Sequence, residues 1–324
     1  MRLDKLYIIG NGFDLHHRLP TSFSGFCEYL RLHNSAISDL LASAISYESS
    51  DYDIWNRFEE NLSFIDMGYL EELVIEYIPS PSDDEYFSDM GACGSESEKI
   101  IFNLTEGLRN EFSNYIQLAC SCKVKSSLLL NIDPNAIYMS FNYTKTLEDH
   151  YGINSDKILY VHGTFDEKEN IVLGHAINPA TFAPKRDNES PPENLSPEEL
   201  EQWYEYMSDQ QNSCLDDARE ELFSYYQRSY KNSDQIIKNN SIFFAELGRI
   251  KSIFVLGHSM SFVDIKYFEA IKARTSELCY WTVSFYGETE KTNLEDVLLG
   301  LGILPTNFNL IKICNLSSDM TTEL

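Results

Sequence analysis

Short apolar runs recur along the chain and are separated by longer polar stretches. Each run is continuous rather than alternating, as expected for a strand that is buried on both faces of a sheet. Seven runs predict strands, at residues 6–10, 136–141, 157–161, 171–174, 252–257, 280–286 and 309–313. We therefore expect an α/β protein with a mainly parallel sheet.

Two of these strands lead into amphipathic helical segments. Thr21 can cap a helix that runs to about His33, with an apolar face spaced at three and four residues. A second helix is predicted over residues 262–274, which carry the same spacing. Both segments fit the strand-loop-helix unit of a parallel sheet.

Two long stretches interrupt this scheme. Residues 35–130 show helical periodicity with a Pro/Ser/Asp-rich break near residues 79–88, and residues 180–245 begin as a polar loop and continue as acidic, tyrosine-rich helix. Neither stretch has a strand series of its own. We expect both as helical insertions in a single α/β domain that covers residues 1–324.

The charge of the chain restricts its partners. A formal net charge of -26, from 51 acidic and 25 basic residues, argues against an extended surface for DNA or RNA, although a small basic pocket stays open. No apolar run approaches the length of a membrane span, and the start of the chain does not fit a signal peptide. We expect a cytoplasmic protein.

The cysteines predict neither a disulfide framework nor a metal site. Seven are scattered along the chain, and the one close pair, Cys120 and Cys122, has no second pair or nearby histidine to complete a zinc site.

The segment Gly10-Asn11-Gly12 follows the first predicted strand. Such a turn lets backbone N–H groups approach a phosphate without a Cβ in the way, and it indicates a nucleotide pocket. The third glycine of the dinucleotide fingerprint is missing, so a tight turn without a ligand is the alternative. Asp14, in the same segment, is a second polar candidate or a turn-capping carboxylate.

Polar residues follow three other predicted strands. These are Asn142, His162 before Gly163, and the segment Gly257-His258-Ser259, with Asp264 a little further on. In a parallel sheet the carboxyl ends of the strands border the ligand crevice, so these side chains are expected on one rim. The alternatives are a turn asparagine and a structural histidine.

Taken in order, these segments resemble the sirtuin-like NAD-binding fold. Its pattern is a Gly-x-Gly loop with a downstream apolar-Pro pair, here Leu19-Pro20, an Asn at a strand end, a His-Gly, and a Gly-x-Ser before an Asp. More narrowly, the chain resembles the AbiH family of phage abortive-infection proteins, over nearly its whole length, through residues 8–14, 55–59, 140–143, 162–163, 174–175 and 257–259.

The resemblance implies a Rossmann-like (sirtuin-like) fold, NAD as substrate or ligand, and roles for individual residues. It puts Asn142 against the nicotinamide ribose and makes His162 the catalytic histidine. The expected cofactor-binding residues are Gly10, Asn11, Gly12, Phe13, Asp14, Gly257 and Ser259. The chain lacks the zinc-site cysteines of protein deacylases and has Tyr-Thr after the asparagine, so relatives that hydrolyse NAD are the closer comparison.

The chemistry agrees with this assignment. Cleavage of the nicotinamide–ribose bond develops positive charge on the ribose, and it needs a group that orients the sugar and a base that polarises a hydroxyl or a water. Asn142 and His162 suit these roles, since an unperturbed histidine has a pKa of about 6.5. The roles of Glu59, His175 and His258 stay open.

Three functions therefore compete. The first is an NAD-hydrolysing effector of phage defence, the second a module that senses NAD or a related nucleotide without cleaving it, and the third a hydrolase or nuclease on the same fold. The negative charge weighs against the nuclease. Whether the protein forms a homo-oligomer or acts with a defence-system partner stays open.

Overall fold

The computed structural model describes residues 4–45, 57–78, 91–183, 191, 195–210 and 213–317. Within these residues the strands form one six-stranded sheet of order β3-β2-β1-β4-β5-β6, and every neighbouring pair is parallel. The strands are β1 (Lys5–Ile9), β2 (Ile137–Ser140), β3 (Ile158–Tyr160), β4 (Ser252–Leu256), β5 (Tyr280–Phe285) and β6 (Phe308–Lys312). The predicted α/β class with a mainly parallel sheet is confirmed.

The central strand β1 explains why the apolar runs are continuous. Leu6 and Ile8 enter a core on one face of the sheet, whereas Tyr7 and Ile9 enter a core on the other. The first core is covered by α14 (Ser241–Ala245), α15 (Ile265–Lys272) and α16 (Glu288–Gly300), and the second by α1 (Asn11–His16) and α10 (Thr146–Tyr151). Because both faces of the sheet are shielded from water, apolar and polar residues do not alternate along the strand.

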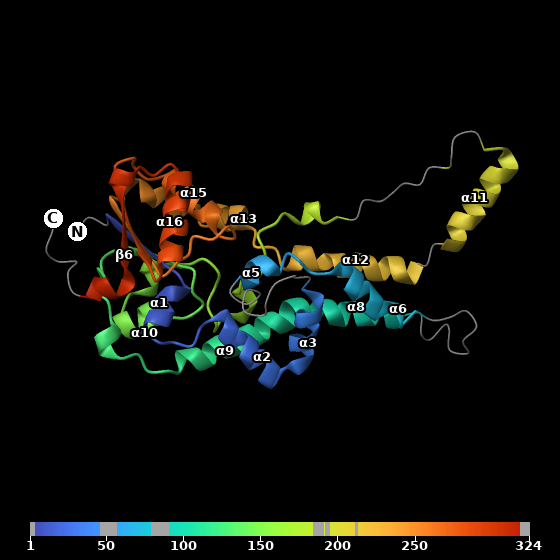
Figure 1. Ribbon diagram of the computed structural model, residues 1–324, viewed down its shortest axis with the longest axis horizontal. Helices are drawn as coiled ribbons and strands as arrows, with labels where there is room; N and C mark the ends of the chain where they lie inside the picture. Colours follow the sequence, from blue (N-terminus) through green and yellow to red (C-terminus); the bar gives the residue numbers. More distant parts are fainter. Residues whose placement is uncertain are drawn as a thin grey trace.

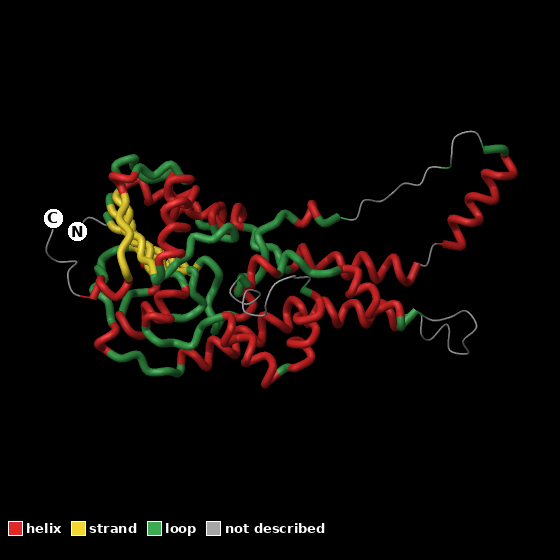
Figure 2. Tube along the Cα trace, viewed as in Figure 1, coloured by secondary structure: helices red, strands yellow, loops and turns green. Residues whose placement is uncertain are grey.

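The predicted insertions form a helical body at the other end of the molecule (Figures 1 and 2). Residues between β1 and β2 supply α2 (Phe23–His33), α3 (Ser35–Ala44), α5 (Phe58–Asn61), α6 (Met67–Ile75), α8 (Ala92–Phe102) and α9 (Leu108–Cys120), with a π-helical turn at Asn103–Gly107. Residues between β3 and β4 supply α11 (Pro197–Gln210) and α12 (Ser213–Arg228), followed by α13 (Ser233–Asn239), which lies outside this body and packs beside α15 at the sheet. The helical character predicted for both stretches is confirmed for the described residues.

One hydrophobic core joins the two insertions. Ala218, Leu222 and Tyr225 of α12 pack with residues of α2, α3, α6, α8 and α9. The hydroxyl of Tyr225 donates to the Leu62 carbonyl at 2.7 Å, which ties α12 to the end of α5. Short 3-10 helices complete the described chain, at Ser126–Leu128, Ser155–Lys157, Lys168–Asn170, Pro179–Thr181, Glu246–Arg249, Pro305–Asn307 and Ile313–Ser317.

The strand predicted at residues 171–174 is wrong. Gly174 packs directly on the chain after α12, where a Cβ would lie 1.7 Å from the Ser229 carbonyl oxygen. The Val172 amide donates to the His162 carbonyl at 2.9 Å, which is a single contact rather than a strand ladder. Residues 171–174 are apolar like a strand because they are buried against the chain after α12 rather than within the sheet.

Two predicted helices differ at their ends. Ser22, rather than Thr21, caps α2 by accepting from the Gly25 amide at 3.1 Å. The Thr21 hydroxyl instead donates to the Asn11 side chain at 2.6 Å. The helix predicted over residues 262–274 is shorter, because the chain becomes α-helical only at Ile265 and leaves the α-helix after Lys272.

The turns after β1 and β4 are interlocked through glycines. The Gly12 amide donates to the Gly257 carbonyl at 2.7 Å, and Gly257 has a φ of +64°. A Cβ on Gly257 would lie 2.0 Å from the Phe13 nitrogen, and one on Gly10 would lie 2.6 Å from the Gly257 oxygen. The two backbones approach so closely that only glycine fits.

We predict that Gly257→Ala lowers the free energy of unfolding by about 3 kcal/mol or more, because it adds left-handed strain and a backbone clash. Gly94→Ala is the matched control, since no atom lies within 4 Å of its Cβ position in α8, and it leaves stability unchanged or raises it by up to about 1 kcal/mol. Urea denaturation measures both, and equal stability of the two variants would refute the interlock.

Candidate functional site

The carboxyl edge of the sheet carries the predicted site residues. In the strand order, β1 lies between β2 and β4. From β1 the chain adds β2 and β3 on one side of the sheet, and it then crosses back to add β4, β5 and β6 on the other side. Open α/β sheets bind ligands outside the carboxyl ends of the strands at such a switch point. The order of this sheet is also that of dinucleotide-binding folds.

Asn142 follows β2 and is fastened to the β1 turn. Its Nδ2 donates to the Gly10 carbonyl at 3.1 Å, and its backbone amide donates to Ser140 Oγ at 3.2 Å. The side-chain oxygen Oδ1 is buried and has no hydrogen-bond partner. The asparagine is therefore held rigidly with one acceptor unused.

His162 follows β3 and lies on the same rim. Ser140 pairs with Tyr160 in the sheet, so two further residues along each chain bring Asn142 beside His162. The imidazole is buried and makes a T-shaped contact with the Phe141 ring at a centroid distance of 5.3 Å. Its Nε2 lies 3.4 Å from Asp264 Oδ1 and its Nδ1 lies 3.5 Å from Lys231 Nζ.

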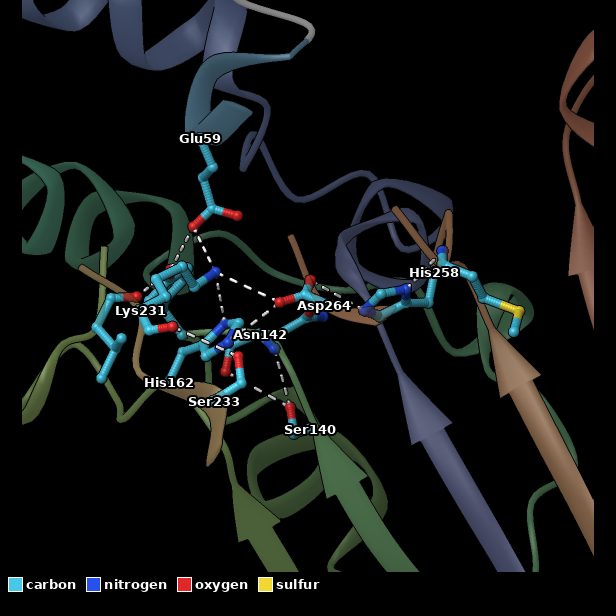
Figure 3. A network of polar contacts seen from close by, with 11 residues as sticks. Glu59, Ser140, Asn142, His162, Lys231, Ser233, His258 and Asp264 are labelled. Atoms are coloured by element: carbon cyan, nitrogen blue, oxygen red, sulfur yellow. Dashed lines mark hydrogen bonds and ion pairs between the residues drawn. The ribbon is translucent and has the colours of Figure 1, made fainter. Parts of the chain in front are cut away.

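A buried lysine, Lys231, lies at the centre of a cluster of polar side chains at the sheet edge (Figure 3). The other members of this cluster are Glu59, Asn142, His162, His258 and Asp264. Lys231 Nζ lies 2.9 Å from Glu59 Oε1 and 3.5 Å from Asp264 Oδ1, and its side chain is fully buried. Glu59 comes from α5, and its Oε1 also accepts from the Tyr143 hydroxyl at 3.2 Å. The two helical insertions thus each supply one charged group to the sheet edge.

His258 completes the cluster on the β4 side. Its Nδ1 accepts from the Met260 amide at 2.8 Å, so the proton of the neutral ring is on Nε2, which faces Asp264 Oδ2 at 3.5 Å. Asp264 Oδ2 therefore faces His258, whereas Oδ1 accepts from the Lys231 ammonium at 3.5 Å and lies near His162 Nε2, which makes no hydrogen bond. It is the one carboxylate that lies next to all three groups.

The charges set the protonation of these groups. Burial raises the pKa of Asp264, but Lys231 and the two histidines outweigh it and hold this pKa below its usual value. Burial, and then the Lys231 charge, lowers the pKa of His162 to about 3. Burial also raises the pKa of Glu59. At neutral pH the site holds an ionised Asp264 beside a neutral imidazole.

The polar groups of the glycine turn after β1 form hydrogen bonds within the protein itself. Asn11 Nδ2 donates to the Thr21 carbonyl at 2.9 Å, and Phe13 is buried in the core below. The Gly12 amide is bonded to Gly257. The predicted contacts of Gly10, Asn11, Gly12, Phe13 and Gly257 with a cofactor stay predictions, as does that of Ser259, which is exposed in the β4 turn.

Asp14 ties α1 to the turn after β2. The hydroxyl of Thr144 donates to Oδ2 at 2.6 Å and that of Thr146 to Oδ1 at 2.7 Å. Burial raises the pKa of Asp14 to about 6 against the effect of these hydrogen bonds. Its contacts are those of a structural carboxylate, and its predicted contact with a cofactor stays a prediction.

His175 lies outside the cluster and holds the backbone of Lys231 in place. Its ring is buried among aromatic side chains, and its carbonyl accepts from the Lys231 amide at 2.8 Å. Burial lowers its pKa to about 4. In the Trp55-x-x-x-Glu59 pattern, Trp55 lies outside the described residues.

Sequence reasoning missed Lys231 altogether. It follows the acidic helix α12, where a lysine is most simply a solvated residue, and no periodicity marks it. Only the packing of both insertions against the sheet edge buries it. Asp264 is present in the sequence pattern, but its position next to His162, Lys231 and His258 depends on the same packing.

Two properties of the described residues concern ligands and location. No group of three or more His, Cys, Asp or Glu side chains among them could hold a metal ion, and none of their helices is long and apolar enough to cross a membrane. An open cleft of about 560 Å³ lies away from the cluster, on the helical body, lined by Ser95, Glu98, Lys99, Phe102, Glu221 and Arg228.

We predict that Asp14 makes the protein less stable as the pH rises from 4 to 7. Its pKa is higher in the folded chain than in the unfolded chain, so the folded state holds the proton longer and its advantage is lost as the pH passes 6. Relative to wild type, Asp14→Asn should gain about 3 kcal/mol over this range, by urea denaturation. A pH-independent difference would contradict the assignment.

Comparison with known proteins places the chain in a family. The model of the family described as Bacteriophage abortive infection AbiH matches residues 6–285, which include β1 from Leu6 onward, β2 to β5, both insertions and every residue of the cluster. No curated protein and no solved structure gives a significant match. The chain therefore belongs to the AbiH family of bacteriophage abortive-infection proteins.

Proposed function

We propose that this protein is an abortive-infection effector that binds NAD at the carboxyl edge of the sheet and hydrolyses its nicotinamide–ribose bond. The observation that carries the proposal is a pair of buried atoms without hydrogen-bond partners, Asn142 Oδ1 and His162 Nε2, at the ends of adjacent strands. The resemblance to sirtuin-like proteins, which stays a prediction, points to the same two residues.

A sugar diol fits these atoms. An unsatisfied buried polar atom costs about 1–3 kcal/mol, so the site gains when a ligand supplies the missing hydrogen bond. Asn142 Oδ1 can only accept, and a ribose hydroxyl can donate to it. Because Gly10 holds the other end of the amide, the ribose would be oriented by a fixed group.

The charges of the cluster suit cleavage at that sugar. Loss of nicotinamide leaves positive charge on the ribose, and an ionised buried carboxylate such as Asp264 favours this charge more strongly than water does. A neutral His162 polarises a ribose hydroxyl or the attacking water once one ring nitrogen presents a free lone pair. In this proposal Asn142 orients the ribose, and His162 takes the proton from the ribose hydroxyl or the water. Asp264 stabilises the positive charge that develops on the ribose.

A sensing module that binds NAD without cleaving it is the second candidate. It is favoured by the burial of most of the cluster, since the side chains of Asn142, His162, Lys231, His258 and Asp264 are almost inaccessible. The two candidates differ in one observable, the release of nicotinamide.

We predict that His162→Ala and Asn142→Ala each lower the rate of NAD loss by ~10²–10⁴-fold, the usual effect of removing a general base or a positioning group. NAD and free nicotinamide are followed with the purified protein and in infected cells. The controls are His33→Ala and Asn309→Ala, which change exposed residues of the same types.

Thermal melting checks that each variant is folded. Folded site variants that consume NAD in infected cells as fast as wild type would refute the catalytic assignment. NAD binding by calorimetry, without nicotinamide release in infected cells, would establish the sensing module instead.

A further inference from the structure

The two helical insertions meet at one buried ion pair over the sheet edge. Glu59 belongs to the insertion between β1 and β2, and Lys231 to the insertion between β3 and β4. The atoms Oε1 and Nζ lie 2.9 Å apart, although 172 positions separate the residues in sequence. Glu59 is the accessible partner, since 16% of its side chain is exposed and none of that of Lys231.

The third contact of Lys231 determines what His162 can do. An ammonium group has only protons to donate, so His162 Nδ1, at 3.5 Å, must present its lone pair to Lys231. The proton of the neutral imidazole is then on Nε2, which faces the Asp264 carboxylate at 3.4 Å. In this arrangement neither ring nitrogen has a lone pair free for a substrate proton.

Among the charged groups around His162, Lys231 has the largest effect on the pKa of the imidazole. The ionisable groups around the imidazole come from five other segments and are Glu59, Tyr143, Lys231, His258, Asp264 and Tyr267. Lys231 carries the one positive charge in direct contact with the ring among the described residues, and after burial it contributes most to the low pKa of His162. A base that must take up a proton is opposed by this charge.

We propose that Lys231, held by Glu59, is a positioning residue that keeps His162 Nδ1 occupied and maintains the site in a resting arrangement until the Glu59–Lys231 pair separates. The inference rests on the proposed function for its catalytic consequence but not for its electrostatic one. It assigns regulation to the junction of the two insertions. When Lys231 leaves Glu59 and moves away from the imidazole as well, Nδ1 is free and His162 can accept a proton.

The test is the titration of His162 by NMR of histidine-labelled full-length protein. His162→Gln identifies its signal. In wild type we expect His162 to stay neutral down to pH 5, and in Lys231→Met we expect its pKa to rise by at least one unit, a tenfold change in proton affinity. An unchanged titration would overturn the proposal.

A second variant guards against misfolding. Lys231→Met leaves the Glu59 and Asp264 carboxylates without their cation, whereas Glu59→Gln/Lys231→Met removes both charges of the pair. The double variant retains Asp264 beside the ring and should show the same upward shift. The control is Asp234→Asn/Lys266→Met, which removes a surface ion pair and should leave His162 unchanged.

NAD consumption separates this inference from the proposed function. If both hold, Lys231→Met consumes NAD at least ~10-fold faster than wild type without infection, because the base is released. A shifted His162 without NAD cleavage in any variant refutes the proposed function alone. Cleavage that a folded Lys231→Met loses refutes the resting arrangement and makes Lys231 a residue that catalysis requires.

Discussion

The buried ammonium of Lys231 is the interaction on which the site depends. It has been moved out of water, which is favourable only if other groups replace its hydration, and Glu59, Asp264 and His162 do so. Those three groups come from an insertion helix, from the segment before α15 and from the end of β3. One charge therefore joins both helical insertions at the sheet edge and sets the protonation of the site.

The sheet prepares the place where this happens. Its strand order brings the ends of β1, β2, β3 and β4 to one rim, and the glycine turns after β1 and β4 pack backbone to backbone. That close packing gives Asn142 a fixed acceptor in the Gly10 carbonyl. The glycines therefore shape the rim from below, whereas a ligand at Asn142 and His162 would be held by side chains.

The sequence predicted the fold correctly where a local run of apolar residues is also buried in the sheet. Continuous apolarity identified the six strands because both faces of the sheet are covered, and the rule that ligands gather at strand ends brought Asn142 and His162 together. The same pattern failed at residues 171–174, where Gly174 is buried against Ser229 rather than in the sheet. Lys231 was beyond reach, because its burial arises from the packing of segments that are distant in sequence.

If the cluster at the sheet edge is a ribose-binding catalytic site, a crystal structure with a non-hydrolysable NAD analogue will show where the ribose binds. We expect a ribose hydroxyl within hydrogen-bond distance of Asn142 Oδ1, beside His162, with the Glu59–Lys231 pair parted. An analogue bound elsewhere, with Asn142 Oδ1 still without a partner and the pair intact, would contradict it.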